Sequence, residues 1–294
     1  MRFIHLVILA IAALAFQSAV AGGVAPCRPD AKWTEPAPPL HIHGNTWFVG
    51  TCGLSAVLIT TPQAHILIDG DVEEDAPLIE ANIRALGFRL EDVRYIVNSH
   101  EHFDHAGGIA RLQRDTHAVV LARAPAAAAL RRGRGDRGDP QFASAKPFAA
   151  VANVRVIDDG ARVRIGTAGI TAHATPGHTP GSTTWTWQSC EQSRCLDIAY
   201  ADSLSAISDD VYRYTDDDAH PGALAAFRRS IAAIAALPCD VLITPHPDVS
   251  DLWLRLGANA SAPLVEPGAC RRYAAKATEG LDARVASEKP KAKP

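Results

Sequence analysis

The sequence predicts an α/β fold arranged as a four-layer αββα sandwich, for two reasons. Short apolar segments typical of strands alternate with longer helical segments along the 294-residue chain. Both halves of the chain are rich in strands and carry helices beside them. Two facing sheets with helices on their outer faces bury the apolar sides of such elements. Residues 22–294, with the ordinary apolar content of a globular protein, are compatible with a single domain.

In the first half, segments rich in Val, Ile and aromatic residues predict strands, and two of the segments that separate these strands predict helices. Strands are expected at residues 47–50, 56–60, 65–69, 95–99 and 118–122, and helices at 76–86 and 105–112.

The second half repeats this style, with a longer helix late in the chain. Strands are expected at residues 154–157, 163–165, 170–174, 182–188, 196–201 and 240–244, and helices at 221–236 and 271–286.

The N-terminus has the pattern of a signal peptide over residues 1–21. Arg2 gives a positive start, residues 6–16 form an apolar core too short to span a bilayer, and residues 19–21 read Ala-Val-Ala, a small-x-small cleavage site. We therefore expect export to the periplasm and no membrane anchor after cleavage. The formal net charge of −3 gives no sign of a nucleic-acid partner, and we expect a monomer.

Two segments are expected to be mobile. Residues 131–140 are charged and Gly-rich, which indicates a solvated loop or a flap beside the active site. The tail, residues 286–294, is rich in Lys and Pro and is expected to be disordered.

The most informative segment is residues 100–105, His-Glu-His-Phe-Asp-His, which follows an apolar strand. His100 and His102 point the same way on an extended backbone, and Asp104 and His105 can turn back toward them. One tetrahedral ion cannot easily take all four donors, but two adjacent ions can share them once two more histidines join. This spacing is typical of a dinuclear metal hydrolase.

Two distant histidines fit that requirement. His178 lies in Thr-Pro-Gly-His-Thr-Pro-Gly, and His246 lies in Thr-Pro-His-Pro. Each follows a strand-like segment and is held in a stiff Pro/Gly-rich loop, as a preorganised ligand requires. Taken alone, either histidine is more often a structural residue.

With these residues the chain resembles the metallo-β-lactamase superfamily, whose motif is His-x-His-x-Asp-His. His100 as first motif residue and serine instead of cysteine in the segment Asp202-Ser203-Leu204-Ser205 resemble subclass B3. The resemblance implies the αββα metallo-β-lactamase fold and two zinc ions per chain. The expected ligands are His100, His102 and His178 for the first zinc, and Asp104, His105 and His246 for the second.

The resemblance further implies hydrolysis of penicillins, cephalosporins and carbapenems by a metal-bridging hydroxide. Asp104 would orient that hydroxide and help to deliver its proton. Ser203 and Ser205 would contact the substrate, and Asp69 would support a metal ligand. Consistently, the chain contains no Gly-x-Ser-x-Gly or Ser-x-x-Lys motif of a serine hydrolase. No lysine follows the Ser203–Ser205 segment closely, which leaves the binding of the substrate carboxylate open. Glu101 is expected to point away from the metals, either toward solvent or behind the ligands.

Six cysteines in an exported chain favour disulfides, and six allow 15 pairings. Cys190 and Cys195 bracket the turn of an expected hairpin and are expected to pair. Cys27–Cys52 and Cys239–Cys270 then follow by proximity in sequence, and this set resembles a three-disulfide branch of subclass B3.

Two alternatives stay open. The first is another hydrolase on the same scaffold, a lactonase or a thioesterase of the glyoxalase type, in which Asp202 would bridge both metals. Export and disulfides argue against the thioesterase, which is usually intracellular. The second is a non-catalytic periplasmic zinc-binding protein, which the complete ligand set argues against.

Overall fold

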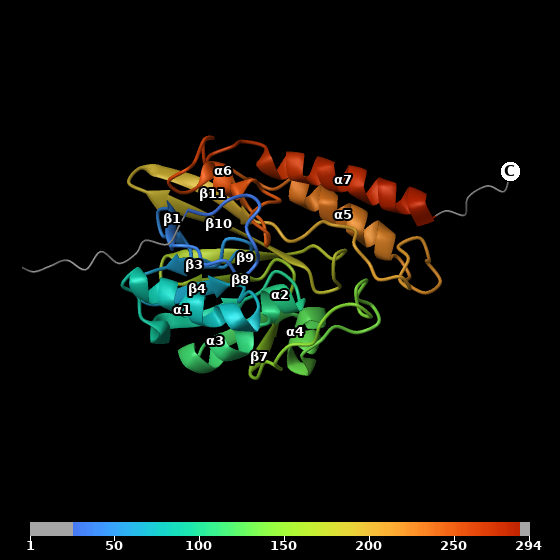
Figure 1. Cartoon of the computed structure of the whole chain (residues 1–294), viewed down its shortest axis with the longest axis horizontal. Helices are drawn as coiled ribbons and strands as arrows, with labels where there is room; N and C mark the ends of the chain where they lie inside the picture. The colour runs from blue at the N-terminus through green and yellow to red at the C-terminus, as the bar shows by residue number, and fades with distance from the viewer. Residues whose placement is uncertain (1–25, 289–294) are drawn as a thin grey trace, which may run out of the picture.

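The computed structural model describes residues 26–288 and has two facing sheets between two layers of helices (Figure 1). The first sheet contains seven strands in sequence order: β1 (Leu40–His43), β2 (Thr46–Phe48), β3 (Val57–Thr60), β4 (His65–Ile68), β5 (Val93–Val97), β6 (Val119–Arg123) and β7 (Val154–Ile157). Pairing is antiparallel from β1 to β4 and parallel from β4 to β7.

The second sheet contains five strands in the order β12 (Val241–Ile243), β11 (Arg194–Tyr200), β10 (Thr183–Glu191), β9 (Ala168–Ala174) and β8 (Arg162–Ile165). Only β11 and β12 pair in parallel.

Helices cover the outer face of each sheet (Figure 1). The first sheet carries α1 (Ala76–Ala85), α2 (Phe103–Ala106), α3 (Ile109–Thr116) and α4 (Ala124–Arg132). The second carries α5 (Ala223–Ala235) and α7 (Ala269–Glu288), while the short α6 (Leu252–Arg255) follows β12. Two short 3₁₀ turns, Glu73–Asp75 and Leu90–Asp92, flank α1.

Side chains alternate between the two faces of each strand, so the first sheet packs against two apolar cores, one between the sheets and one under the helices. In β3, Val57 and Ile59 pack between the sheets, whereas Leu58 packs against the helices. In β4, Ile66 and Ile68 face the other sheet and Leu67 faces the helices. Successive strand residues point to opposite faces, so a sheet buried on both faces needs an unbroken apolar run. The predicted four-layer αββα sandwich is therefore confirmed.

Some expected elements differ in detail. The helix expected at 105–112 is interrupted at Gly107 and Gly108, giving α2 and α3. A Cβ at Gly108 would lie 2.1 Å from the carbonyl oxygen of Gly70, so the backbone packs too closely there for a larger residue. The strand β1 and the helices α4 and α6 were not predicted from the sequence.

The expected disorder is wrong for the start of the 286–294 tail. Residues 286–288 continue α7, because Glu288 pairs with Arg284 at 2.6 Å and accepts hydrogen bonds from the backbone N–H groups of Tyr214 and Thr215. Residues 289–294 and the signal peptide expected at 1–21 lie outside the described residues. Within residues 26–288, no helix has the length and apolar character needed to cross a bilayer.

Three disulfides join Cys27 to Cys52, Cys190 to Cys195 and Cys239 to Cys270, the pairings expected above. The first fixes the N-terminal segment to the β2–β3 connection, the second closes the β10–β11 hairpin, and the third joins α7 to the segment before β12.

Candidate metal centre

The predicted metal ligands converge at one edge of the sandwich, where strands of both sheets end. His100, His102, Asp104 and His105 follow β5, His178 lies between β9 and β10, and His246 follows β12. All are buried except His246, which is partly exposed. Strand ends on a packed scaffold hold side chains in fixed positions, as a preorganised site requires.

His100, His102 and His178 form one group, with ligand atoms within 4.8 Å of one another. One nitrogen of each ring is held from outside the group. His100 Nδ1 lies 2.8 Å from Asp202 Oδ1, His102 Nε2 lies 3.1 Å from Asp139 Oδ1, and His178 Nδ1 donates to the Ser205 carbonyl at 3.0 Å. These contacts fix the rings and leave the opposite nitrogens for a shared ligand.

The state of His100 Nε2 shows whether this group of histidines fits a metal ion. It is buried and has no hydrogen-bond partner among the described residues. Burial and the neighbouring histidines keep the pKa of His100 well below its usual value, so the ring is neutral with a free lone pair. A neutral imidazole is the form that binds a metal ion.

Asp104, His105 and His246 form a second group. Asp104 Oδ2 lies 3.3 Å from His105 Nε2 and 3.4 Å from His246 Nε2, and the two nitrogens are 3.2 Å apart. Two ligands on one tetrahedral zinc lie about 3.3 Å apart, given bonds of about 2.0–2.1 Å. His100 also belongs to a group with Asp104 and His105, so the two sites are adjacent.

Asp69 lies behind this second group, near the ring of His105. Its carboxylate is fully buried, accepts hydrogen bonds from Ser99 N at 2.6 Å, Ser99 Oγ at 2.7 Å and Tyr200 Oη at 2.7 Å, and lies 4.0 Å from His105 Nδ1. Burial raises the pKa of Asp69 to about 6, against the opposing effects of His105 and these donors. Asp69 thus joins the ends of β4, β5 and β11 beneath the cluster.

Of the two positions expected for Glu101, the structure shows the one behind the ligands and not the one facing solvent. The side chain is buried because it accepts hydrogen bonds from Thr179 Oγ1 at 2.7 Å and from Gly181 N at 2.9 Å. Burial raises the pKa of Glu101 to about 7. Glu101 therefore ties the loop that carries His178 to the loop that carries His100 and His102.

Two supporting carboxylates were not identified in these roles from the sequence. Asp202 follows β11 and contacts His100, and Asp139 contacts His102. Asp139 lies in the segment 131–140 and is 1% exposed, so the end of that segment is part of the site and not only a solvated loop. A single carboxylate in a Gly-rich loop carries no sequence signal for this contact.

The sequence and the fold of this chain are similar to those of known proteins. A family model described as the metallo-beta-lactamase superfamily matches residues 49–191. The crystal structure of MEM-A1, a subclass B3 metallo-beta-lactamase from a soil metagenome library, is 48% identical, with a TM-score of 0.84 and coverage of 87% of this chain and 98% of MEM-A1. The chain belongs to the metallo-β-lactamase superfamily.

A second solved metallo-beta-lactamase is similar over its whole length, whereas the curated relatives match only in part. The Rm3 metallo-beta-lactamase is 47% identical, with a TM-score of 0.85 and coverage of 90% of this chain and all of that one. Among curated proteins, the N-acyl homoserine lactonase AttM of Agrobacterium fabrum is 37% identical over 84 residues. That match covers 21% of this chain and 32% of the lactonase, so the chain spans only about a third of the curated relatives' length.

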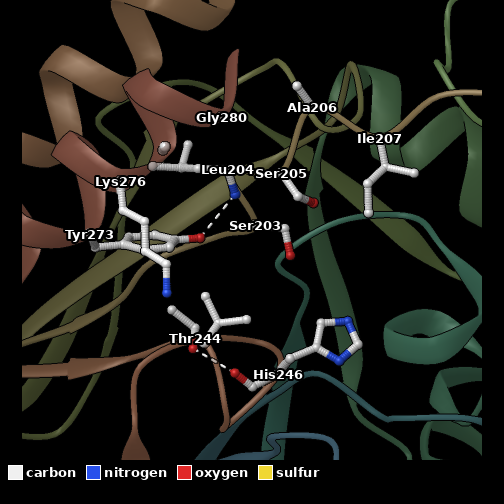
Figure 2. Close-up of a pocket in the computed structure, with 12 residues that line it drawn as sticks. Ser203, Leu204, Ser205, Ala206, Ile207, Thr244, His246, Tyr273, Lys276 and Gly280 are labelled. Carbon is white, nitrogen blue, oxygen red and sulfur yellow. Dashed lines mark hydrogen bonds between the residues drawn. The ribbon is translucent and has the colours of Figure 1, made fainter. Parts of the chain in front are cut away.

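Beside the metal-ligand groups of this superfamily member lies a pocket of about 310 Å³ (Figure 2). Ser203, Ser205 and His246 line it, so both predicted substrate-contacting serines face the same space as a predicted metal ligand. Trp33, which is 43% exposed, lies beside the second ligand group, with its ring centroid 5.5 Å from that of His246.

Proposed function

We propose that this protein is a zinc-dependent β-lactamase of the subclass B3 type, which opens the β-lactam ring of penicillins, cephalosporins and carbapenems. The observation that carries the proposal is the 47–48% identity to metallo-β-lactamases over nearly their whole length, combined with two convergent groups of buried donors. Such identity over a complete fold is far stronger support than the short lactonase match.

We assign two zinc ions to the six donors, the first to His100, His102 and His178, and the second to Asp104, His105 and His246. The donors are nitrogen and carboxylate oxygen without thiolate, a set that suits zinc, and three protein ligands per ion mark a catalytic rather than a structural site. Bound zinc supplies a nucleophile at neutral pH and polarises the carbonyl that is attacked.

Other side chains orient the ligands, position the attacking water and bind the substrate. Asp202, Asp139 and the Ser205 carbonyl keep the three histidine rings of the first site in one tautomer and one orientation. Asp104 has a second carboxylate oxygen, which we assign to orienting the attacking water and to passing a proton toward the leaving nitrogen. Ser203 and Ser205 hold the substrate. No side chain is acylated, so carbapenems cannot trap the protein as an acyl-enzyme.

We further propose that the protein acts in the periplasm as a monomer, after removal of residues 1–21. Its three disulfides support an oxidising compartment. β-Lactams meet their targets in the same compartment.

A second candidate is an N-acyl homoserine lactonase, because the curated matches over part of the chain carry that activity. The two functions differ in the bond that breaks, an amide in one case and an ester in the other.

Side-by-side kinetics test the proposal. We expect kcat/KM for benzylpenicillin and a carbapenem to exceed that for N-acyl homoserine lactones and glutathione thioesters, with two zinc ions per chain by elemental analysis. Chelators should abolish turnover, and added zinc should restore it. A faster lactone or thioester reaction would replace the β-lactamase assignment, whereas no turnover with both ions bound would favour the non-catalytic alternative.

A further inference from the structure

The pocket beside His246 contains one Lys or Arg side chain, Lys276, which has no part in the proposed metal site. Helix α7 forms one wall of the pocket and places Lys276 in it (Figure 2). The lysine side chain extends between Tyr273 and Thr244, and its ammonium group faces the space opposite His246. Apart from Lys276 and His246, the pocket is lined by apolar and hydroxyl side chains, among them Ser203, Leu204 and Ser205, and by Gly280.

Three charged residues of α7 have no ion-pair partner within residues 26–288, namely Arg271, Lys276 and Glu279, and of these Lys276 is the one that lines the pocket. Arg272 pairs with Glu266, Arg284 pairs with Glu288 at 2.6 Å, and Asp282 pairs with Arg228 at 2.7 Å. Among the ion pairs of residues 26–288, none includes Lys276. A cation beside an apolar wall, with hydroxyl groups nearby and no acidic partner, is suited to an anionic ligand.

The position of Lys276 relative to the metal ligands is fixed by α7 itself. Tyr273, one turn earlier, donates to the Asp202 carbonyl at 2.9 Å and accepts from Leu204 N at 2.9 Å. Asp202 in turn contacts His100. The Cys239–Cys270 disulfide holds the start of the helix. The helix and the segment that carries Ser203 and Ser205 are therefore held together.

We propose that Lys276 binds the carboxylate of the substrate, with Ser203 and Ser205 completing the subsite. This inference rests on the proposed function and deepens it. Substrate β-lactams carry a carboxylate on the ring fused to the β-lactam, a few atoms from the bond that breaks. A cation across the pocket from His246 holds that carboxylate while the carbonyl faces the metals. Lys276 is a binding residue, so its effect falls on KM.

The test compares wild type with Lys276→Ala on benzylpenicillin and on its methyl ester. Because Lys276 is exposed, solvent would partly screen its ion pair with the substrate carboxylate, and we expect a roughly three- to ten-fold higher KM for the acid. We expect kcat within about two-fold and no change for the ester. Lys276→Arg should recover most of the loss, and Lys276→Glu should increase it.

Two controls separate this effect from general electrostatics. Arg271→Ala removes a positive charge from the same helix outside the pocket and should leave both substrates unaffected. Lys146, whose Nζ lies 5.1 Å from the Phe103 ring centroid, is the rival cation near the site. The proposal is wrong if Lys276→Ala affects acid and ester equally, or if Lys146→Ala alone shows the acid-specific loss.

A binding measurement keeps the inference testable apart from turnover. Titration calorimetry of the zinc-loaded protein with cyclopentanecarboxylate and with cyclopentanecarboxamide should show weaker carboxylate binding in Lys276→Ala and unchanged amide binding. If wild type hydrolyses no β-lactam, the proposed function fails, and this titration still decides whether Lys276 binds carboxylates. Equal carboxylate affinities in wild type and Lys276→Ala would overturn the inference.

Discussion

A histidine that binds a metal through one ring nitrogen is oriented by the hydrogen-bond partner of its other ring nitrogen. Here the outer partners are unequal: His100 and His102 contact the buried carboxylates Asp202 and Asp139, whereas His178 donates to a backbone carbonyl. A carboxylate partner raises the basicity of the ring more than a carbonyl does. The first site therefore depends on residues that are themselves not expected to touch the metal.

Replacing Asp202 with Ala should weaken the first zinc site by about ten- to hundred-fold, since His100 loses the contact that orients it. The second site, formed by Asp104, His105 and His246, should keep its affinity. Competition with a zinc-binding dye would measure both affinities. Asp202→Asn, which retains an acceptor oxygen, should show a smaller loss. Loss of both sites together would instead support the alternative in which Asp202 bridges the metals.

Replacing Asp104 with Ala should leave one zinc per chain instead of two and lower kcat/KM by at least about a hundred-fold. The second ion loses its only carboxylate ligand, and the attacking water loses the group that orients it. Elemental analysis and benzylpenicillin kinetics on the same preparation would check both effects. A variant with two ions and near wild-type turnover would contradict the role assigned to Asp104.

The parts of the fold and of the site that were predicted best from the sequence are those with local signals. His178 and His246 were found because each follows an apolar segment and lies in a Pro/Gly-rich loop, and the structure brings both beside residues 100–105. Asp139 and Lys276 were missed because their roles depend on the path of a loop and on the face of a helix distant in sequence. The break between α2 and α3 was missed for a similar reason, since it arises from the approach of Gly70.

The buried Asp75 at the start of helix α1 makes the stability of the folded state depend on pH. Asp75, at the N-terminal boundary of the helix, is buried, and one of its carboxylate oxygens lacks a partner among the described residues. Burial and the charge of Glu74 raise the pKa of Asp75 to about 7. Because this folded-state pKa exceeds the unfolded value, the folded state binds the extra proton, and its stability falls as pH rises from about 4 through 7.

Asp75→Asn should remove that pH dependence. We expect the Tm of the variant relative to wild type to be roughly 2–6 °C higher at pH 8 than at pH 5, because wild type must ionise the buried group as pH rises. Thermal melts of both proteins at the two pH values check this, with the comparison made within each pH so that changes in zinc loading cancel. The same difference in Tm at pH 5 and pH 8 would show that Asp75 does not titrate as described.

The metal site is shared between the two sheets. The first sheet supplies His100, His102, Asp104 and His105, and the connections of the second supply His178 and His246. Neither half has a complete site, so metal binding requires the two sheets to pack correctly. Bound zinc should therefore raise the Tm of the whole fold, because the ions bind only the native arrangement.

The disulfides should differ in their effects on thermal stability and on substrate binding. Chain-entropy arguments give about 2 kcal/mol for the short Cys190–Cys195 loop and about 4 kcal/mol for Cys239–Cys270, whose cysteines are 31 residues apart. The double variant Cys190→Ser/Cys195→Ser should lower Tm modestly and leave kinetics unchanged, since the hairpin tip is at the far end of β10 and β11 from the site. Cys239→Ser/Cys270→Ser should lower Tm further and raise KM for benzylpenicillin, because α7 carries Tyr273 and Lys276. Equal kinetics in the two double variants would contradict this distinction.

The order of the cysteines along the chain also bears on how the protein matures. Each cysteine pairs with the next one in sequence, the first with the second, the third with the fourth and the fifth with the sixth. A chain that enters an oxidising compartment N-terminus first presents each cysteine to its native partner before any other cysteine arrives. Oxidation in the order of arrival thus yields the native set out of 15 combinations, and maturation by this route needs no disulfide isomerase.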